Sequence, residues 1–255
     1  MLPIDLISSI YVFAILFFIV ALVYSSVGMG GGSSYTAIMA LLSFNILAIP
    51  IISLILNLMV TSIGSFNFIR NRHARFKLIL PFLLSSIPMA YIGGYLNVPA
   101  DFFYWILLIS LIFVAARIYL WKSISINTEF SNRKKLTISI ISGSILGFIA
   151  GIVGIGGGIY LVPLIIILGL GTEKEAAACG AIFIWLNSFS GLASRLQYND
   201  INFLEYWPLL IAVIAGGTIG SYFGSYKISP KLIDKILGIV ILVAIVFLLK
   251  KIFFL

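Results

Sequence analysis

Two short glycine clusters are the part of this chain whose residue types and spacing could bind a ligand. They read Val27-Gly28-Met29-Gly30-Gly31-Gly32 and Val153-Gly154-Ile155-Gly156-Gly157-Gly158. Glycine tolerates the backbone angles that break a helix, and a helix that restarts after such a break exposes unpaired N–H groups and its positive dipole end. A helix start of this kind can hold an anion without any Lys or Arg. The alternative is that glycines only let neighbouring helices pack closely, which we expect for Gly93, Gly94, Gly216, Gly217 and Gly220.

Hydroxyl and amide side chains near the clusters could add donors to such an anion site. Two serines follow the first cluster, and polar residues recur at helical spacing in the apolar segments that come after each cluster. The same side chains could instead bond to a neighbouring helix or to the carbonyl four residues earlier. The predicted binding residues are Gly28, Gly30, Gly31, Gly32, Gly154, Gly156, Gly157 and Gly158, with Ser33, Ser34, Asn57, Thr61, Asn187 and Ser190.

The composition decides the class of protein. Of 255 residues, 62% are hydrophobic and only 9% are charged, whereas soluble domains average about 25% charged residues. These values exclude a soluble enzyme, a nucleic-acid-binding domain and a disordered chain. One Cys and one His provide neither a disulfide nor a set of metal ligands, and the apolar segments carry no cluster of acids. We therefore expect a membrane protein that is not an enzyme, with no catalytic residue, no cofactor and no bound metal.

Long uncharged stretches indicate the membrane spans. Residues 6–69 contain no Asp, Glu, Lys, Arg or His, which is enough for about three spans at ~20 residues each. The whole chain divides into about ten helical segments, about eight to ten of them spans, beginning with a helix at residues 6–27. A short segment follows each glycine cluster, at 33–44 and at 159–171. Because such a segment covers little more than half of the hydrocarbon core, we expect a broken or re-entrant helix in each place.

The chain is predicted to contain two homologous repeats, 1–127 and 128–255. The glycine clusters lie 126 residues apart (27 to 153), and later landmarks such as Gly64 and Gly191 lie 127 apart. A period of half the chain length indicates a duplicated unit. The two repeats together would form one integral membrane domain.

Charge in the connecting segments indicates that the two repeats have opposite orientations. Segment 70–77 is basic, whereas its counterpart at 195–205 is net negative. Segment 97–101 carries a single acid, whereas 227–235 is basic, as is the central connector at 117–135. Basic segments favour the cytoplasmic side of a membrane. The predicted fold class is therefore an all-α integral membrane protein made of two inverted-topology repeats, with about five helical segments in each.

The duplicated Gly-(Ile or Met)-Gly-Gly-Gly pattern resembles the sulfite exporter TauE/SafE family, also called TSUP. In the second half the likeness continues through Val162-Pro163, Ser190-Gly191, residues 198–202 and Gly220. This chain has Cys179 and Gly180 where the family pattern often has a Thr-Ser pair. The resemblance implies an integral membrane permease, without enzymatic activity, for small sulfur-containing anions such as sulfite and organosulfonates.

We predict a secondary transporter that binds a small anion near the mid-membrane plane between the repeats and moves it by alternating access. A passive anion channel and a non-transporting membrane scaffold or assembly protein are the alternatives. The expected partners are the anion and membrane lipid, with no nucleic acid; a homodimer is compatible with the sequence, but nothing in it requires one. The expected location is the cell (plasma) membrane, as a multi-pass protein.

Overall fold

Ten α-helices make up the described chain. The computed structural model describes residues 4–26, 29–42, 44–120, 131–199, 202–224 and 230–254. The first half contains α1 (Ile4–Ser25), α2 (Gly32–Leu41), α3 (Ala48–Arg70), α4 (Phe76–Tyr95) and α5 (Ala100–Leu120). The second half contains α6 (Asn132–Val153), α7 (Gly158–Ile167), α8 (Glu173–Arg195), the short 3₁₀ helix η1 (Phe203–Tyr206), α9 (Trp207–Gly224) and α10 (Pro230–Phe254). The described residues include no strand, so the predicted all-α class with about ten helical segments is confirmed.

The first three helices of the two halves correspond in length. Both α1 and α6 have 22 residues, both α2 and α7 have 10, and both α3 and α8 have 23. The short helices end earlier than the predicted boundaries of 44 and 171. In α7 the cause is Gly169, which has a φ of 61° and turns the chain so that the Leu170 N–H bonds to the Ile165 carbonyl. Such a left-handed glycine is a common helix terminator.

Five of the described helices are long and apolar enough to cross a bilayer, namely α3, α4, α5, α6 and α8. Shorter apolar stretches occur at Ile10–Ser25 in α1, Gly158–Ile167 in α7 and Trp207–Tyr222 in α9. Many large apolar side chains remain exposed, among them Leu84 at 68% and Leu120 at 74%. In a chain with so few charges, these surfaces are suited to lipid. The chain is therefore an integral membrane protein with several spans.

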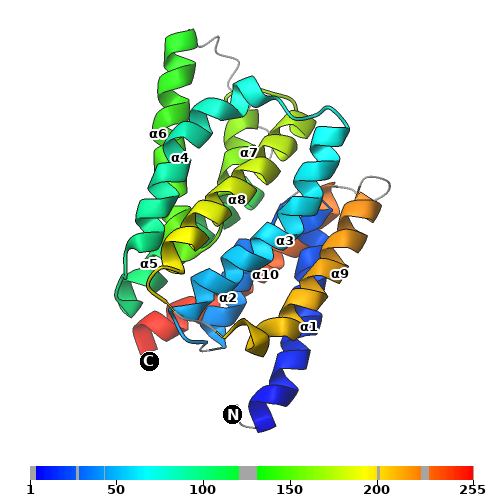
Figure 1. The fold of residues 1–255 in the computed structure, drawn as a ribbon, viewed down its shortest axis with the longest axis vertical. Coiled ribbons are helices and arrows are strands. Elements are labelled where there is room, and N and C mark those ends of the chain that lie inside the picture. The colour runs from blue at the N-terminus through cyan, green and yellow to red at the C-terminus, as the bar shows by residue number, and fades with distance from the viewer. Residues whose placement is uncertain are drawn as a thin grey trace.

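The most extensive contacts join helices from different halves. Helix α1 packs along α9, and α4 packs along α6. By position in its half, α1 corresponds to α6 and α9 corresponds to α4, so the two pairs are equivalent. Helices α3 and α8, which are counterparts of each other, also pack together in the middle of the molecule (Figure 1). The halves are thus interlocked into one structural unit.

A stripe of glycines explains how closely α6 approaches α4. Gly143, Gly147 and Gly151 are spaced four residues apart and so share one face of α6. A Cβ added at Gly143 would lie 2.6 Å from the Phe82 carbonyl oxygen of α4, and one added at Gly147 or Gly151 would overlap the carbonyls of the next two turns. The backbones therefore touch, as in small-residue contacts between membrane helices.

The α1–α9 pair repeats this arrangement. Cβ atoms added at Gly216 and Gly220 of α9 would overlap the carbonyl oxygens of Phe18 and Leu22 in α1. The predicted packing role is confirmed for these two glycines. It is also confirmed for Gly94 of α4, where an added Cβ would lie 2.7 Å from a backbone oxygen of α8.

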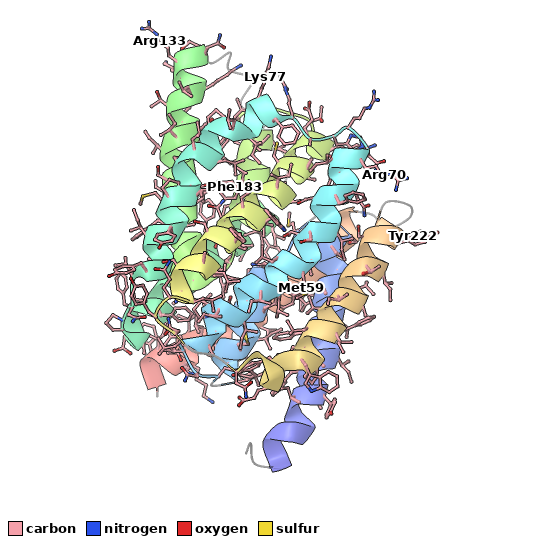
Figure 2. The ribbon with its side chains drawn as sticks, in the orientation of Figure 1. Met59, Arg70, Lys77, Arg133, Phe183 and Tyr222 are labelled. Atoms are coloured by element: carbon pink, nitrogen blue, oxygen red, sulfur yellow. The ribbon has the colours of Figure 1, made fainter. Side chains whose placement is uncertain are left out.

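Basic residues gather at one end of the bundle. Arg70 at the end of α3, Lys77 at the start of α4 and Arg133 at the start of α6 lie at the same end (Figure 2). The two chain termini lie at the opposite end (Figure 1). This grouping agrees with the predicted sidedness for segment 70–77 and for the described part of 117–135. Residues 121–130 and 225–229 lie outside the described chain.

Candidate functional site

Both glycine clusters break the helix path, as predicted. Gly31 has a φ of 86° and stands immediately before α2. In the second cluster Gly154, Gly156 and Gly157 have φ values of 81°, 79° and 78°, and Gly157 stands immediately before α7. These left-handed conformations strain any residue with a Cβ, so glycine is favoured at these four positions. Gly28, the first glycine of the predicted set, lies outside the described residues.

The two breaks meet at the side chain of Asn57. This residue lies on α3 and is fully buried, and its Nδ2 donates to the Gly154 carbonyl oxygen at 3.3 Å. A Cβ added at Gly30 would lie 2.5 Å from Asn57 Oδ1, and one added at Gly156 would lie 3.1 Å from Asn57 Nδ2. The clusters also touch directly, since a Cβ added at Gly32 would come within 2.7 Å of the Ile155 carbonyl oxygen. Residues 126 positions apart in the sequence thus lie side by side in the fold.

The two short helices present their starts at this site. The N–H groups of Ser34 and Tyr35 share the Gly31 carbonyl oxygen, both at 3.0 Å. In the same way Tyr160 and Leu161 donate to the Gly157 carbonyl oxygen, at 3.1 and 3.3 Å. The N–H groups that precede these donors in each helix have no carbonyl within their own helix. Each start therefore combines free N–H groups with the positive end of a helix dipole.

The predicted polar side chains lie in different surroundings. Ser33 and Ser34 each lie 2.8 Å from the Tyr24 hydroxyl of α1. Thr61 donates to the Asn57 carbonyl oxygen at 2.6 Å, while its methyl carbon lies 3.1 Å from a Cβ added at Gly30. The structure therefore brings these three residues to the first cluster.

The two predicted residues on α8 form hydrogen bonds of their own. Asn187 Nδ2 donates to the Phe183 carbonyl oxygen at 2.8 Å, one turn earlier in the same helix. Ser190 donates to the Ile87 carbonyl oxygen of α4 at 2.7 Å. On α8 it is Ser188 whose hydroxyl reaches the second cluster, 3.1 Å from a Cβ added at Gly156.

Three buried tyrosines were missed by the sequence reasoning. Tyr24, Tyr35 and Tyr160 are at most 5% exposed. The Tyr35 hydroxyl lies 2.9 Å from a Cβ added at Gly31, beside the start of α2. The Tyr35 hydroxyl has no hydrogen-bond partner among the described residues, whereas the Tyr160 hydroxyl lies near Ser110 of α5. The positions of Tyr35 and Tyr160 near the starts of α2 and α7 could have indicated this, because side chains in the first turn of a helix lean back toward its start.

A buried arginine caps the C-terminal end of α6, the helix that precedes the second break. Arg195 is 3% exposed and donates from Nη2 to the carbonyl oxygens of Gly151 and Ile152, at 2.9 and 2.7 Å. These carbonyls belong to the last turn of α6, which has no helical donors of its own. No sequence signal points to this contact, since Arg195 and Gly151 are 44 residues apart.

The described residues around the two breaks offer neutral hydrogen-bond donors. Arg195 is the one charged side chain that is buried in the described chain, and its guanidinium donates hydrogen bonds to carbonyls of α6. The described residues contain no group of three or more His, Cys, Asp or Glu that could hold a metal. Free main-chain N–H groups and phenol hydroxyls remain, which are the donor types that suit an anion.

A bundle of apolar helices in which two short helices begin at paired breaks is typical of multi-pass membrane transporters. A family model described as Sulfite exporter TauE/SafE matches residues 13–248, and the chain belongs to this family. It is 36% identical over 236 residues to the probable membrane transporter protein y4hK of Sinorhizobium fredii, which covers 91% of this chain and 94% of that protein. It is 30% identical over 242 residues to the probable membrane transporter protein MJ0441 of Methanocaldococcus jannaschii, with 87% and 90% covered. No solved structure gives a significant match.

Proposed function

We propose that this chain is a secondary transporter of the plasma membrane that carries small sulfur oxyanions, such as sulfite or sulfonates. The observation that carries the proposal is the meeting of two helix starts at Asn57. Each start offers N–H groups without helical acceptors, and Asn57 contacts both glycine clusters. An anion held there would receive donors from both halves of the chain.

An inverted repeat accounts for this arrangement. The first three helices have the same lengths in both halves, and the α1–α9 and α4–α6 pairs are equivalent under the exchange of halves. In Figure 1, α1 begins at the end where the termini lie, whereas its counterpart α6 begins at the opposite end. Two units of opposite direction that share one central site can expose it alternately to either side of the membrane.

The close contact of the glycine clusters favours a carrier over an open channel. Gly32 and Ile155 are packed against each other, and Asn57 fills the space beside them. An anion can therefore enter only when the two halves move apart on one side. A passive channel would need a continuous path through this contact. A scaffold function would leave the buried, unpartnered hydroxyl of Tyr35 without a role.

The choice of sulfur oxyanions rests on the family. The matching family is described as a sulfite exporter family, and the match covers residues 13–248. Several acceptor oxygens on one small anion would suit a site that has donors on opposite sides. We propose transport without enzymatic chemistry, in line with the relatives that are named probable membrane transporter proteins.

The test is flux in proteoliposomes that contain the purified full chain. Sulfite, thiosulfate, sulfoacetate, sulfate and chloride are compared with empty liposomes, with and without a pH gradient. We expect saturable uptake of at least one sulfur oxyanion and counterflow when the liposomes are preloaded with it. Absence of saturable flux for every anion would contradict the proposal. Single-channel currents in planar bilayers would establish the channel alternative instead.

A further inference from the structure

Ile184 of α8 has the position in the second half of the chain that Asn57 of α3 has in the first half. The two residues are 127 positions apart, which is the offset between the later landmarks of the two halves. Asn57 lies against the first glycine cluster. A Cβ added at Gly30 would be 2.5 Å from Asn57 Oδ1, and one added at Gly32 would be 2.9 Å from the same atom. Position 57 therefore lines the first break.

Ile184 lies against the second glycine cluster in the same way. A Cβ added at Gly156 would be 2.7 Å from Ile184 Cγ2, and one added at Gly158 would be 2.6 Å from Ile184 Cδ1. These glycines are the counterparts of Gly30 and Gly32, 126 positions earlier. One half of the chain therefore places an amide at its break, whereas the other half places an apolar side chain there.

The surroundings of Ile184 are those of a polar site rather than of the hydrophobic core. Its side chain is 2% exposed, yet it lies outside the main cluster of buried apolar side chains that the described residues form. A Cβ added at Gly156 would also be 3.1 Å from Asn57 Nδ2 and 3.1 Å from the Ser188 hydroxyl oxygen. A methyl group, an amide and a hydroxyl thus face the same point of the second break.

The hydroxyl at this point is available to a ligand. Ser188 is fully buried, and its hydroxyl has no hydrogen-bond partner among the described residues. An unmade hydrogen bond of a buried polar group costs free energy. An anion oxygen that entered between the two halves would accept the Ser188 proton. An anion bound there would also be in contact with Ile184.

We propose that Ile184 determines substrate specificity, because it makes one wall of the site apolar and so selects anions that carry a short alkyl group over wholly polar anions. The proposal rests on the function proposed above and narrows its substrate to small organosulfonates. Sulfate has oxygen atoms on every side, so one of them would lose its hydration against Ile184 without gaining a partner. An alkanesulfonate directs its oxygens to the helix starts and Ser188, and its alkyl group to Ile184.

The test compares two organosulfonates of equal charge and similar size. Propanesulfonate ends in a methyl group where isethionate ends in a hydroxyl. Each is used to inhibit the uptake of radiolabelled ethanesulfonate into proteoliposomes that contain the purified full chain. We expect an inhibition constant about tenfold lower for propanesulfonate, because a hydroxyl placed against an apolar wall loses its hydrogen bonds to water. Equal constants, or no inhibition by either compound, would overturn the proposal.

Two substitutions at the same position separate polarity from size. Valine and threonine have nearly the same shape and differ by a methyl group or a hydroxyl. Ile184→Val should keep the preference for propanesulfonate, whereas Ile184→Thr should reduce it to about twofold or less. Ile182→Thr is the control, because Ile182 is also buried on α8 but lies two residues away and so on another face of the helix. The proposal is wrong if Ile184→Thr discriminates as well as Ile184→Val.

Failure of this proposal and failure of the proposed function give different results. If sulfite or sulfate shows saturable flux and the two organosulfonates compete equally, the transporter stands and Ile184 has no part in its specificity. If no anion moves, the proposed function fails, and the shift of the unfolding midpoint by each organosulfonate in detergent then decides whether Ile184 discriminates between them. If Ile184→Thr does not fold, Ile184→Ala replaces it and should lose about fourfold in affinity for propanesulfonate per methylene contact removed.

Discussion

Arg195 Nη2 donates to the Ile152 carbonyl oxygen at 2.7 Å, and this contact fixes the end of α8 to the end of α6. The same nitrogen also bonds to Gly151 at 2.9 Å, one residue earlier. The chain thereby satisfies two orphan carbonyls next to a helix break with one buried cation. The corresponding end of α1 uses local serines instead, with Ser26 donating to the Val23 carbonyl oxygen at 2.6 Å. The two breaks are therefore stabilised differently.

Replacing Arg195 should destabilise the fold. Arg195→Leu leaves the Gly151 and Ile152 carbonyls without donors, and hydrogen bonds to a charged group contribute about 1.5–3 kcal/mol each. The measurement is the thermal unfolding midpoint of the purified protein in detergent. Arg70→Leu, at the exposed end of α3, is the matched control and should change the midpoint little. Equal midpoints for the two variants would show that the Arg195 contacts add no stability.

Adding a methyl group at the α4–α6 contact should destabilise the fold far more than adding one at Gly64, where there is open space. A Cβ at Gly147 would overlap the Ser86 backbone, whereas nothing lies within 4 Å of a Cβ at Gly64. Gly147→Ala should therefore lower the unfolding midpoint, and Gly64→Ala should leave it unchanged or raise it, because alanine is favoured over glycine in a helix by about 1 kcal/mol. The prediction fails if both variants unfold at the same temperature.

Lys251 should contribute to stability while its neighbour Lys250 should not. Lys251 Nζ donates to the Ala40 carbonyl oxygen at the end of α2, at 2.9 Å, and lies 4.9 Å from the centre of the Tyr104 ring. Lys250 is exposed. We expect Lys251→Met to cost about 1–2 kcal/mol and Lys250→Met to be neutral in the same unfolding assay. A loss of similar size in both variants would point to net charge rather than to this contact.

Tyr35 should affect anion affinity rather than the stability of the empty protein. Tyr35→Phe removes a hydroxyl that has no partner among the described residues, so no existing hydrogen bond is lost. We expect an unchanged or higher unfolding midpoint, and an apparent KM for the anion raised about fivefold to tenfold, since a neutral hydrogen bond contributes about 1 kcal/mol. Ser86→Ala removes another unpartnered buried hydroxyl and should leave KM unchanged. An unchanged KM in the Tyr35→Phe variant would exclude this phenol from the site.

The sequence predicts those structural features that depend on residues close together in the chain. Uncharged stretches and glycine clusters predict the helices and both breaks because hydropathy and backbone freedom act within a few residues. Contacts across the fold leave no such signal. Asn57 and Gly154 are 97 residues apart, and their meeting depends on how α3 packs against the second half. Ser190 shows the same limit, because its hydroxyl proton goes to Ile87 of α4, which its helical spacing does not reveal.

Equilibrium binding of radiolabelled sulfite to the purified protein tests most directly whether the paired helix starts hold the anion. Gly31→Ala and Gly157→Ala place a Cβ at left-handed positions that begin α2 and α7, and Gly64→Ala is the control. The account predicts that the control binds like the unchanged protein, while each of the other two variants loses at least tenfold in affinity yet elutes as a folded, monodisperse species. Full-affinity binding by both folded variants would contradict it.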